Sequence, residues 1–314
     1  MRNISKTQRA LAAAALAMTL SAGSGKAAGV PQPRGKVLVV LSSESKITLK
    51  NDVVHPTGFF LPELMVPVKK LIEAGYQPVF ADPKGTPAVM DRVSDGAFWF
   101  GDVPGASAQA KAQAQSDYRE IRELCRQLGI CGDDLTGARN LESLPEIVAG
   151  GLEQYVGVLV PGGHAPMEDL LKDLDLGTIL RHFHDARKPT ALICHGPIAL
   201  LSAMTDPGSF VAALEKGDST AAAKHAKNWI YKGYSMAIFT TAEEKQEEPG
   251  GQDNALGGFV KFYPDYALSR AGGKVQPAAK WTPNVVVDRE LITGQNPMSD
   301  KALADALVKA LAKK

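Results

Sequence analysis

The sequence predicts an α/β fold, with a mainly parallel sheet and helices on both of its faces. The first observation is that short apolar runs alternate with helical segments from residue 36 to the C-terminus, the pattern of strand–helix–strand units. The second is the corner after residues 190–193, where an apolar run is followed at once by Gly196, Pro197 and a helical segment. A strand that turns sharply into a proline-started helix is typical of such sheets.

Size and charge agree with this class. The chain has 314 residues, of which 45% are hydrophobic and 22% are charged, enough for one large α/β domain or two small ones. Its formal net charge of +1 does not indicate binding to nucleic acid or to an acidic membrane surface.

The first 35 residues are expected to lie outside the fold. Residues 1–27 have a basic start, an apolar run over 10–20 and small residues before a cleavage site. This run is too short to span a bilayer, and the pattern is that of a signal peptide. Residues 28–35 indicate a linker, which leaves 36–314 as the folded domain. We therefore expect an exported protein, periplasmic or secreted, that is soluble once the signal is removed.

The elements of the domain are expected in the following order. A buried strand over 36–43 lacks the glycine-rich loop of a dinucleotide site, so no such cofactor is expected. A helix over 59–74, interrupted by Pro62 and Pro67, leads to a strand over 76–81. Further strands are predicted over 155–160, 190–193, 233–240 and in a hairpin over 284–294; further helices are predicted after residue 163 up to about 184, and over 198–204, 254–270 and 299–313.

Residues 83–152 do not follow the alternation and are long for a connection. They contain a polar, alanine-rich helix over 106–128 and the aromatic cluster Phe98, Trp99 and Phe100. We interpret this segment as an inserted cap over one edge of the sheet. The aromatic cluster is expected in the core of the cap; the alternatives are a cage around a ligand and an exposed apolar patch.

The chain has three cysteines, and two of them are close in sequence. Cys125 and Cys131 are six residues apart and can form a disulfide in an oxidising compartment, which would leave Cys194 as the odd thiol. Spacing alone does not show whether the geometry permits that bond.

Cys194 is the candidate nucleophile because it stands at the corner between the strand over 190–193 and the next helix. Backbone N–H groups and the helix dipole favour an anion there, so we expect a lowered thiol pKa and a thiolate at rest. His195 can supply positive charge or carry a proton, as in a nucleophile elbow. The alternative is a small buried cysteine that ends a core strand.

Other strand ends supply candidate partners. Glu63 lies among apolar residues, which predicts a raised carboxyl pKa and a proton held at neutral pH. The alternative is a helix residue whose carboxylate faces solvent. Gly162 and Gly163 follow the strand over 155–160, where their N–H groups can act as oxyanion donors. His164 ends the same loop.

A partner for His195 is expected from a further strand end, where Glu243 and Glu244 stand next to each other. His182 and His184 are two residues apart on a predicted helix and therefore make a poor metal pair. We expect both on the surface.

With these residues in place, the chain resembles the PfpI superfamily, which has a class I glutamine amidotransferase-like fold. Within it, the closest resemblance is to the branch of heat-shock chaperones that act as cofactor-independent glyoxalases, called glyoxalase III. The matching stretches are 57–64, 160–164, 191–197, 239–244 and 284–297. The resemblance implies a flavodoxin-like, doubly wound sheet with a cap, usually in a homodimer.

The resemblance also implies roles for the residues. Cys194 would be the nucleophile, Glu63 the protonated carboxyl against it, and Glu244 the third member with His195. The N–H groups of Gly163 and His195 would form the oxyanion hole, in a substrate-binding loop with Gly162 and His164.

Two departures from the family pattern matter. Its members work mostly in the cytosol, whereas this chain carries an export signal. Some relatives hold a metal through two histidines and one carboxylate, but Val68 and Lys69 stand about where a histidine would be needed. We therefore expect neither a metal nor another cofactor.

The expected function is that of a glyoxalase III-type hydro-lyase, which converts methylglyoxal or glyoxal to the 2-hydroxy acid through a Cys194 hemithioacetal. The alternatives are a stress-related holding chaperone or protein deglycase, or a cysteine peptidase or amidase, which would need an open groove. Glutamine amidotransfer is disfavoured because the chain has no histidine after His225.

Overall fold

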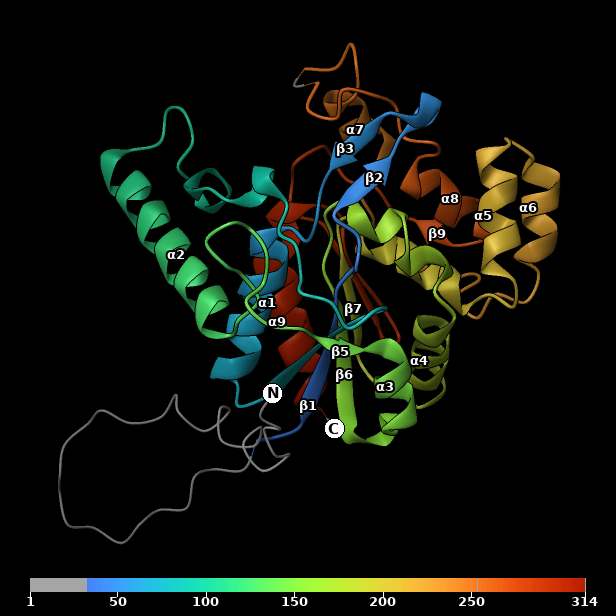
Figure 1. Ribbon diagram of the computed structural model, residues 1–314, viewed down its shortest axis with the longest axis horizontal. Coiled ribbons are helices and arrows are strands. Elements are labelled where there is room, and N and C mark those ends of the chain that lie inside the picture. Colours follow the sequence, from blue (N-terminus) through green and yellow to red (C-terminus); the bar gives the residue numbers. More distant parts are fainter. Residues whose placement is uncertain (1–32, 253, 314) are drawn as a thin grey trace, which may run out of the picture. The chain divides into compact units, whose positions relative to one another are not determined.

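The computed structural model describes residues 33–252 and 254–313, and Figure 1 shows them as a coloured ribbon. The predicted signal peptide over 1–27, and the linker up to residue 32, lie outside the described residues. None of the described helices is long and apolar enough to cross a bilayer.

The described residues form a central seven-stranded sheet in the order β10-β11-β7-β6-β1-β4-β5. Its strands are β1 (Lys36–Val40), β4 (Gln77–Asp82), β5 (Glu142–Ser143), β6 (Tyr155–Val160), β7 (Thr190–Ile193), β10 (Val285–Asp288) and β11 (Leu291–Gly294). All neighbours pair in parallel except the β10–β11 hairpin. The predicted mainly parallel sheet is therefore confirmed.

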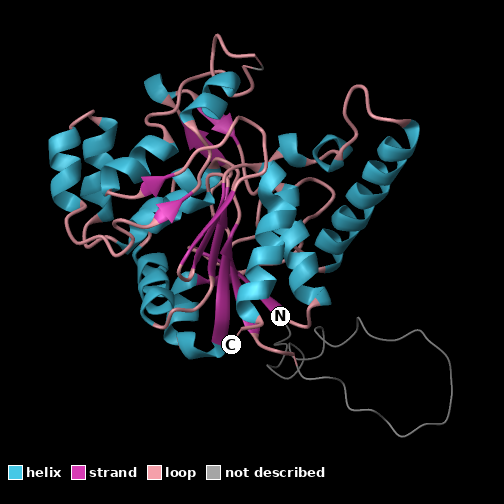
Figure 2. Ribbon diagram, turned by 180° about the vertical axis from the view of Figure 1, so that it is seen from behind, coloured by secondary structure: helices cyan, strands magenta, loops and turns pink. Residues whose placement is uncertain are grey.

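Helices cover both faces of this sheet, as Figure 2 shows. Val37 and Val39 of β1 belong to the core under α1 (Leu61–Glu73) and α9 (Asp300–Leu311), which pack on each other. Leu38 and Val40 belong to the opposite core, under α3 (Leu144–Ala149) and α4 (Leu174–Asp185). Since successive side chains of a strand point to opposite faces, these near-continuous apolar strands are buried on both sides.

Smaller elements surround the carboxyl ends of the strands. Two short sheets pair β2 (Lys46–Thr48) with β3 (Val54–Pro56) and β8 (Ser235–Met236) with β9 (Lys274–Val275). The remaining α-helices are α2 (Ala108–Gln127), α5 (Pro207–Glu215), α6 (Ser219–His225), α7 (Thr241–Glu247) and α8 (Pro264–Ala271), and the main 3₁₀ segments are η3 (Arg92–Ser94), η4 (Ala97–Phe100), η6 (Ala165–Met167), η7 (Leu170–Lys172), η8 (Gly196–Ala203) and η9 (Pro297–Ser299).

Several predicted elements differ from the structure. Of the strand expected over 233–240, only β8 forms, because later N–H groups bond elsewhere: that of Ala237 to Thr293 Oγ1 and that of Phe239 to the Cys194 carbonyl. The helix expected over 254–270 begins only at Pro264, which is favoured as a first helical residue. The segment over 198–204 is 3₁₀ rather than α.

Two expectations about single residues also change. Pro67 does not interrupt α1, which runs through it, and Pro62 lies in its first turn, where its missing N–H has no partner to lose. His182 and His184 are half-buried rather than exposed. The ring of His184 packs on Tyr231 and Tyr234.

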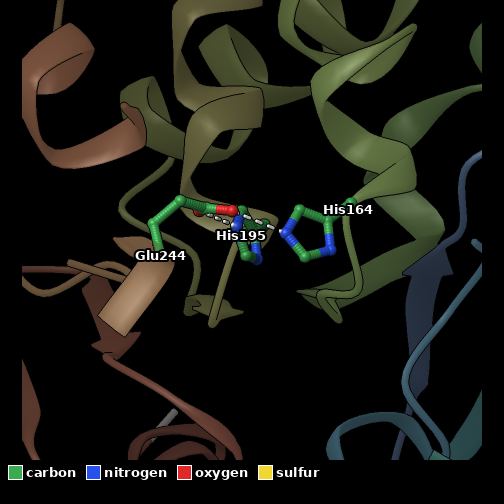
Figure 3. Close-up of side chains that lie close together, drawn as sticks. All are labelled: His164, His195 and Glu244. Atoms are coloured by element: carbon green, nitrogen blue, oxygen red, sulfur yellow. Dashed lines mark hydrogen bonds and ion pairs between the residues drawn. The ribbon is translucent and has the colours of Figure 1, made fainter. Parts of the chain in front are cut away.

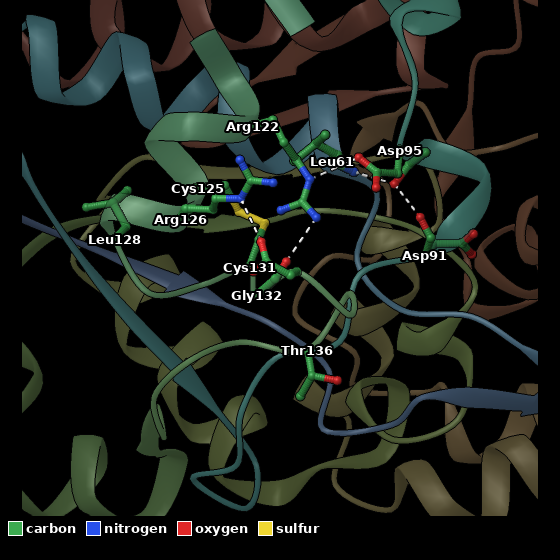
Figure 4. The surroundings of a disulfide bond; sticks show 12 residues. Leu61, Asp91, Asp95, Arg122, Cys125, Arg126, Leu128, Cys131, Gly132 and Thr136 are labelled. Carbon is green, nitrogen blue, oxygen red and sulfur yellow. Dashed lines mark hydrogen bonds and ion pairs between the residues drawn. A yellow bond between two sulfur atoms is a disulfide. The ribbon is translucent and has the colours of Figure 1, made fainter. Parts of the chain in front are cut away.

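The disulfide between Cys125 and Cys131 is confirmed, with the two Cα atoms 5.3 Å apart. It joins the end of α2 to the following loop, inside the segment predicted as a cap (Figure 4). Arg122 of α2 donates to Asp95 at 3.0 Å and to the Gly132 carbonyl at 3.0 Å. The first bond holds α2 to the residue after η3, and the second holds it to the loop that follows α2. The last part of the predicted cap, β5 and α3, instead extends the main sheet layer.

The 3₁₀ segment η3 and its N-cap residue Asp91 support the start of α1. The Ser94 hydroxyl accepts the Leu61 N–H at 2.9 Å, and Asp91 accepts the Thr57 hydroxyl at 2.8 Å. The first turn of α1, which carries Glu63, is therefore anchored to the capping segment.

Candidate active site

Cys194 stands at the end of β7 in a strained corner. Its φ is +60°, a left-handed conformation that is costly for a residue with a side chain and that is common at functional sites. Backbone bonds hold it there: its N–H donates to the Gly294 carbonyl and its carbonyl accepts the Phe239 N–H, both at 2.9 Å. A Cβ on the following Gly196 would lie 2.6 Å from the Val160 carbonyl oxygen, so this tight turn requires glycine.

His195, Glu244 and His164 form a chain of hydrogen bonds beside the thiol, shown in Figure 3. The Nδ1 atom of His195 lies 3.4 Å from the Cys194 sulfur, and its Nε2 lies 2.8 Å from Glu244 Oε2. The other oxygen of Glu244 lies 2.8 Å from His164 Nε2. All three of these side chains are buried.

This geometry fixes the proton positions. An ionised carboxylate only accepts hydrogen bonds, so the Nε2 atoms of both histidines carry their protons toward Glu244. In neutral His195 the Nδ1 atom is then an unprotonated acceptor that faces the thiol. His195 is thus oriented as a general base, in the manner of a catalytic triad.

The charges of the group follow from burial and mutual contact. Burial raises the pKa of Glu244, but the two imidazoles outweigh it and hold that pKa well below its usual range. Burial lowers the pKa of His164, and the opposing Glu244 charge then lifts it to about 9. Burial and the positive charge of His164 lower the pKa of His195. At neutral pH, His164 and Glu244 form an ion pair next to a neutral His195.

Glu63 faces Cys194 from the other side. It is fully buried, and this burial raises its pKa to about 8, so it holds a proton at neutral pH. Its Oε2 accepts the Gly162 N–H at 3.0 Å. A Cβ built on Gly162 would lie 2.6 Å from both the Cys194 Cβ and Glu63 Oε2. The Glu63 carboxyl and the Cys194 side chain therefore both pack against Gly162, where a larger residue would not fit.

The second glycine of the loop completes the surroundings of the sulfur. Gly163 has φ +84°, and a side chain there would overlap the Gly58 carbonyl. Its N–H acts to lower the pKa of Cys194, so it lies on the side of the sulfur where a donor could hold a reacting oxygen.

The expectation of a resting thiolate is wrong. Burial raises the pKa of Cys194 well above its ordinary value. The following helix is a 3₁₀ segment of eight residues, and its N–H groups do not offset the lost solvation. The thiol therefore needs a base to be activated, and His195 Nδ1 is placed to be that base.

The structure places Glu244, and not Glu243, beside His195. Glu243 points the other way and accepts hydrogen bonds from Thr240, Gln295 and Asn296. Both carboxylates lie in the first turn of α7, which Thr240 caps.

The sulfur of Cys194 lines a cavity of about 660 Å³. Many elements contribute to its lining, including β3, the cap, the glycine loop, the region after α7, the loop before β10 and η9. The other lining residues include His55, Phe60, Asp91, Val93, Phe98, Trp99, Gly163, His164, His195, Phe239, Leu256, Trp281 and Met298. Sequence reasoning missed Trp281, Gln252 and Leu256, which carry no local motif. It also missed that His164 pairs with Glu244.

Among the described residues, His164, His195 and Glu244 are grouped closely enough to consider a metal, with ligand atoms within 4.8 Å of one another. The same atoms already hydrogen-bond to each other at 2.8 Å. Their approach is explained without an ion.

Comparisons with known proteins show which families and folds this chain resembles. The sequence profile of the DJ-1/PfpI family matches residues 131–232. The chain is 25% identical over 273 residues to the protein/nucleic acid deglycase HchA of Staphylococcus aureus strain MSSA476, a match that covers 87% of this chain and 78% of that protein.

Solved structures with the same fold include glyoxalase III from Candida albicans, with 19% identity and a TM-score of 0.60 over 88% of this chain and 97% of that one. They also include the 24 kDa Rapid Encystment Protein of Francisella tularensis, with 20% identity and a TM-score of 0.58 over 88% and 99% of the two chains. The chain thus carries a DJ-1/PfpI family domain over residues 131–232, and it is similar in sequence to a protein deglycase and in fold to a glyoxalase III.

Proposed function

We propose that this protein is a cysteine-dependent glyoxalase III-type enzyme, which adds water to a 2-oxoaldehyde and yields the 2-hydroxy acid without a cofactor. The observation that carries the proposal is the position of the Cys194 thiol between two groups of opposite role. His195, oriented by Glu244, is a base, and Glu63 is an acid at neutral pH.

The reaction begins with proton transfer from the thiol to His195 Nδ1. The sulfur then adds to the aldehyde carbon, and the alkoxide formed faces the Gly163 N–H. Glu63 gives its proton to this alkoxide, which yields a hemithioacetal. The new Glu63 carboxylate is now a base next to the carbon that still bears the aldehyde hydrogen.

Glu63 then removes that hydrogen as a proton and returns it to the neighbouring carbonyl carbon. The proton on His195 goes to the oxygen of that second carbon. The hydroxyl of the first carbon then gives its proton to the Glu63 carboxylate, which restores the acid and leaves a thioester carbonyl. One water hydrolyses the thioester and restores the thiol. The net change is addition of one water, with no external oxidant or reductant.

The test is whether the protein converts methylglyoxal to lactate without glutathione. The product is measured by chromatography, and its deuterium content is measured by NMR after reaction in D₂O. We expect wild type to form lactate with deuterium at carbon 2, because the Glu63 proton exchanges with solvent. Cys194→Ala and Glu63→Gln should lose turnover. The exposed Glu153→Gln is the control, since its carboxylate is 87% exposed. Full turnover in either site variant would contradict the mechanism.

Protein deglycation is the second candidate, supported by the deglycases that the chain resembles. It would use the same thiol against the hemithioacetal or aminocarbinol that a dicarbonyl forms on a protein. Repair of a methylglyoxal-treated peptide, measured with free methylglyoxal removed by a separate trap, separates this activity from glyoxalase turnover. Repair that persists with the trap present would favour the deglycase.

Export and dimerisation also remain proposals. The basic and apolar start of the sequence supports an exported protein, and family resemblance supports a homodimer. N-terminal sequencing of the mature chain and light scattering of the purified protein test them. A start at Met1, or a monomer at micromolar concentration, would contradict them.

A further inference from the structure

The active-site cavity is much larger than methylglyoxal requires. A cavity of about 660 Å³ is in the range that typically takes a drug-sized ligand. Methylglyoxal has only five non-hydrogen atoms and would leave most of this space to water. The site is thus built for a substrate with a larger group beyond the reacting carbons.

The cavity wall shows which kind of group fits. Trp99 of the cap and Trp281 of the loop before β10 face the same cavity, with ring centroids 6.4 Å apart. Each indole packs edge-to-face against a phenyl ring that also lines the cavity: the ring centroids of Phe60 and Trp99 are 4.8 Å apart, and those of Phe239 and Trp281 are 5.6 Å apart. Such edge-to-face contacts fix ring orientation.

Both indole N–H groups already have partners within the protein. Trp99 Nε1 donates to the Val93 carbonyl at 2.7 Å, and Trp281 Nε1 donates to the Gln246 side chain. The two tryptophans can therefore offer a ligand only apolar ring surface. They favour a flat, uncharged and preferably aromatic group.

Trp281 is held in an unusual backbone conformation. Its φ is +57°, which is a strained value for a large side chain. Its N–H donates to Glu243 Oε1 at 2.9 Å, and the same carboxylate is tied to Asn296 at 2.8 Å. Glu243 is thus a positioning residue for this wall, which gives the buried carboxylate beside Glu244 a role that the chemistry does not use.

We propose that the preferred substrate is an aryl 2-oxoaldehyde, whose ring packs against Trp99 and Trp281 while its aldehyde carbon reaches Cys194. The proposal rests on the proposed glyoxalase function and assigns its substrate class. The chemistry is unchanged: phenylglyoxal and one water give mandelate, as methylglyoxal and one water give lactate.

The experiment compares kcat/KM for phenylglyoxal, methylglyoxal and glyoxal with the purified full chain, with mandelate, lactate and glycolate measured by chromatography. The Cys194→Ala variant corrects for reaction of phenylglyoxal with arginine side chains. We expect wild type to prefer phenylglyoxal over methylglyoxal by about tenfold or more, the scale that one well-fitted apolar group supplies.

Variants of the wall make the test specific. Trp281→Ala and Trp99→Ala should each lower kcat/KM for phenylglyoxal about tenfold, mainly through KM, with methylglyoxal little changed. Glu243→Gln should also lower the ratio of kcat/KM for phenylglyoxal to kcat/KM for methylglyoxal. It should alter the tryptophan signal in near-UV circular dichroism as well. The matched control is Trp229→Phe, because Trp229 is buried away from the cavity, with its indole on the Leu200 carbonyl.

The outcomes separate the two proposals. Methylglyoxal turned over as well as phenylglyoxal by wild type, or equal losses for both substrates in the wall variants, would overturn the aryl preference and leave the glyoxalase function standing. Absence of turnover with all three substrates would overturn both.

Discussion

Glu63→Gln should abolish turnover and yet stabilise the protein at neutral pH. The glutamine keeps the shape of the side chain and the oxygen that accepts the Gly162 N–H at 3.0 Å. It removes the ionisation that burial makes costly. Loss of activity and gain of stability from one change would show that Glu63 is kept for chemistry.

The magnitude follows from the pKa of Glu63, which burial raises from 4.5 to about 8. Below pH 4.5 the carboxyl is protonated in both the folded and the unfolded chain, so the variant gains nothing. As the pH rises from 4.5 toward 8, only the unfolded chain releases the proton, and wild type loses stability. At pH 7 the loss over those 2.5 pH units is about 3 kcal/mol.

The assay is urea unfolding of wild type and Glu63→Gln at several pH values between 4.5 and 8. The difference in unfolding free energy should be near zero at pH 4.5 and approach about 3 kcal/mol at pH 7. Glu153→Gln, the exposed control, should stay within about 0.5 kcal/mol of wild type throughout. A difference independent of pH, or a less stable Glu63→Gln at pH 7, would refute the assignment of a buried protonated acid.

Three further changes test other parts of the structure. His164→Gln removes the positive charge that, after burial, lowers the pKa of His195; that pKa should rise and move the acid limb of the kcat/KM profile to higher pH, and an unmoved limb would count against the ion pair. Gly162→Ala places a Cβ 2.6 Å from the nucleophile's Cβ and should lower kcat about a hundredfold, with unchanged far-UV circular dichroism. Replacing Cys125 and Cys131 by serine opens a loop of six-residue separation and should cost about 2 kcal/mol in urea unfolding.

Features that depend on neighbouring residues could be predicted from the sequence. The corner at Cys194 is a local signal, since an apolar run, a glycine and a proline follow one another within a few residues. The parallel sheet follows from the repeated alternation of strands and helices. For Glu63 the sequence allows either a buried carboxyl with a raised pKa or a solvent-facing helix residue. Its full burial shows that the first interpretation is correct.

Features that depend on distant residues could not be predicted. His164 and Glu244 are 80 residues apart, and no local pattern joins them. The pKa of the Cys194 thiol depends on how completely other segments exclude water. The rule that a helix N-terminus lowers a thiol pKa therefore predicts the wrong direction of the shift. The expected strand over 233–240 failed because Ala237 bonds to Thr293, 56 residues away.

The two adjacent carboxylates of α7 have a consequence for how this protein can diverge. Consecutive helical residues point about 100° apart, so one turn directs Glu244 to the imidazoles and Glu243 to the Trp281 backbone. An insertion or deletion in this turn would displace the proton relay and one wall of the pocket together. We therefore expect changes of substrate preference to accumulate on the opposite wall, at Trp99, whose indole N–H donates to Val93 of the cap rather than to Glu243 or Glu244.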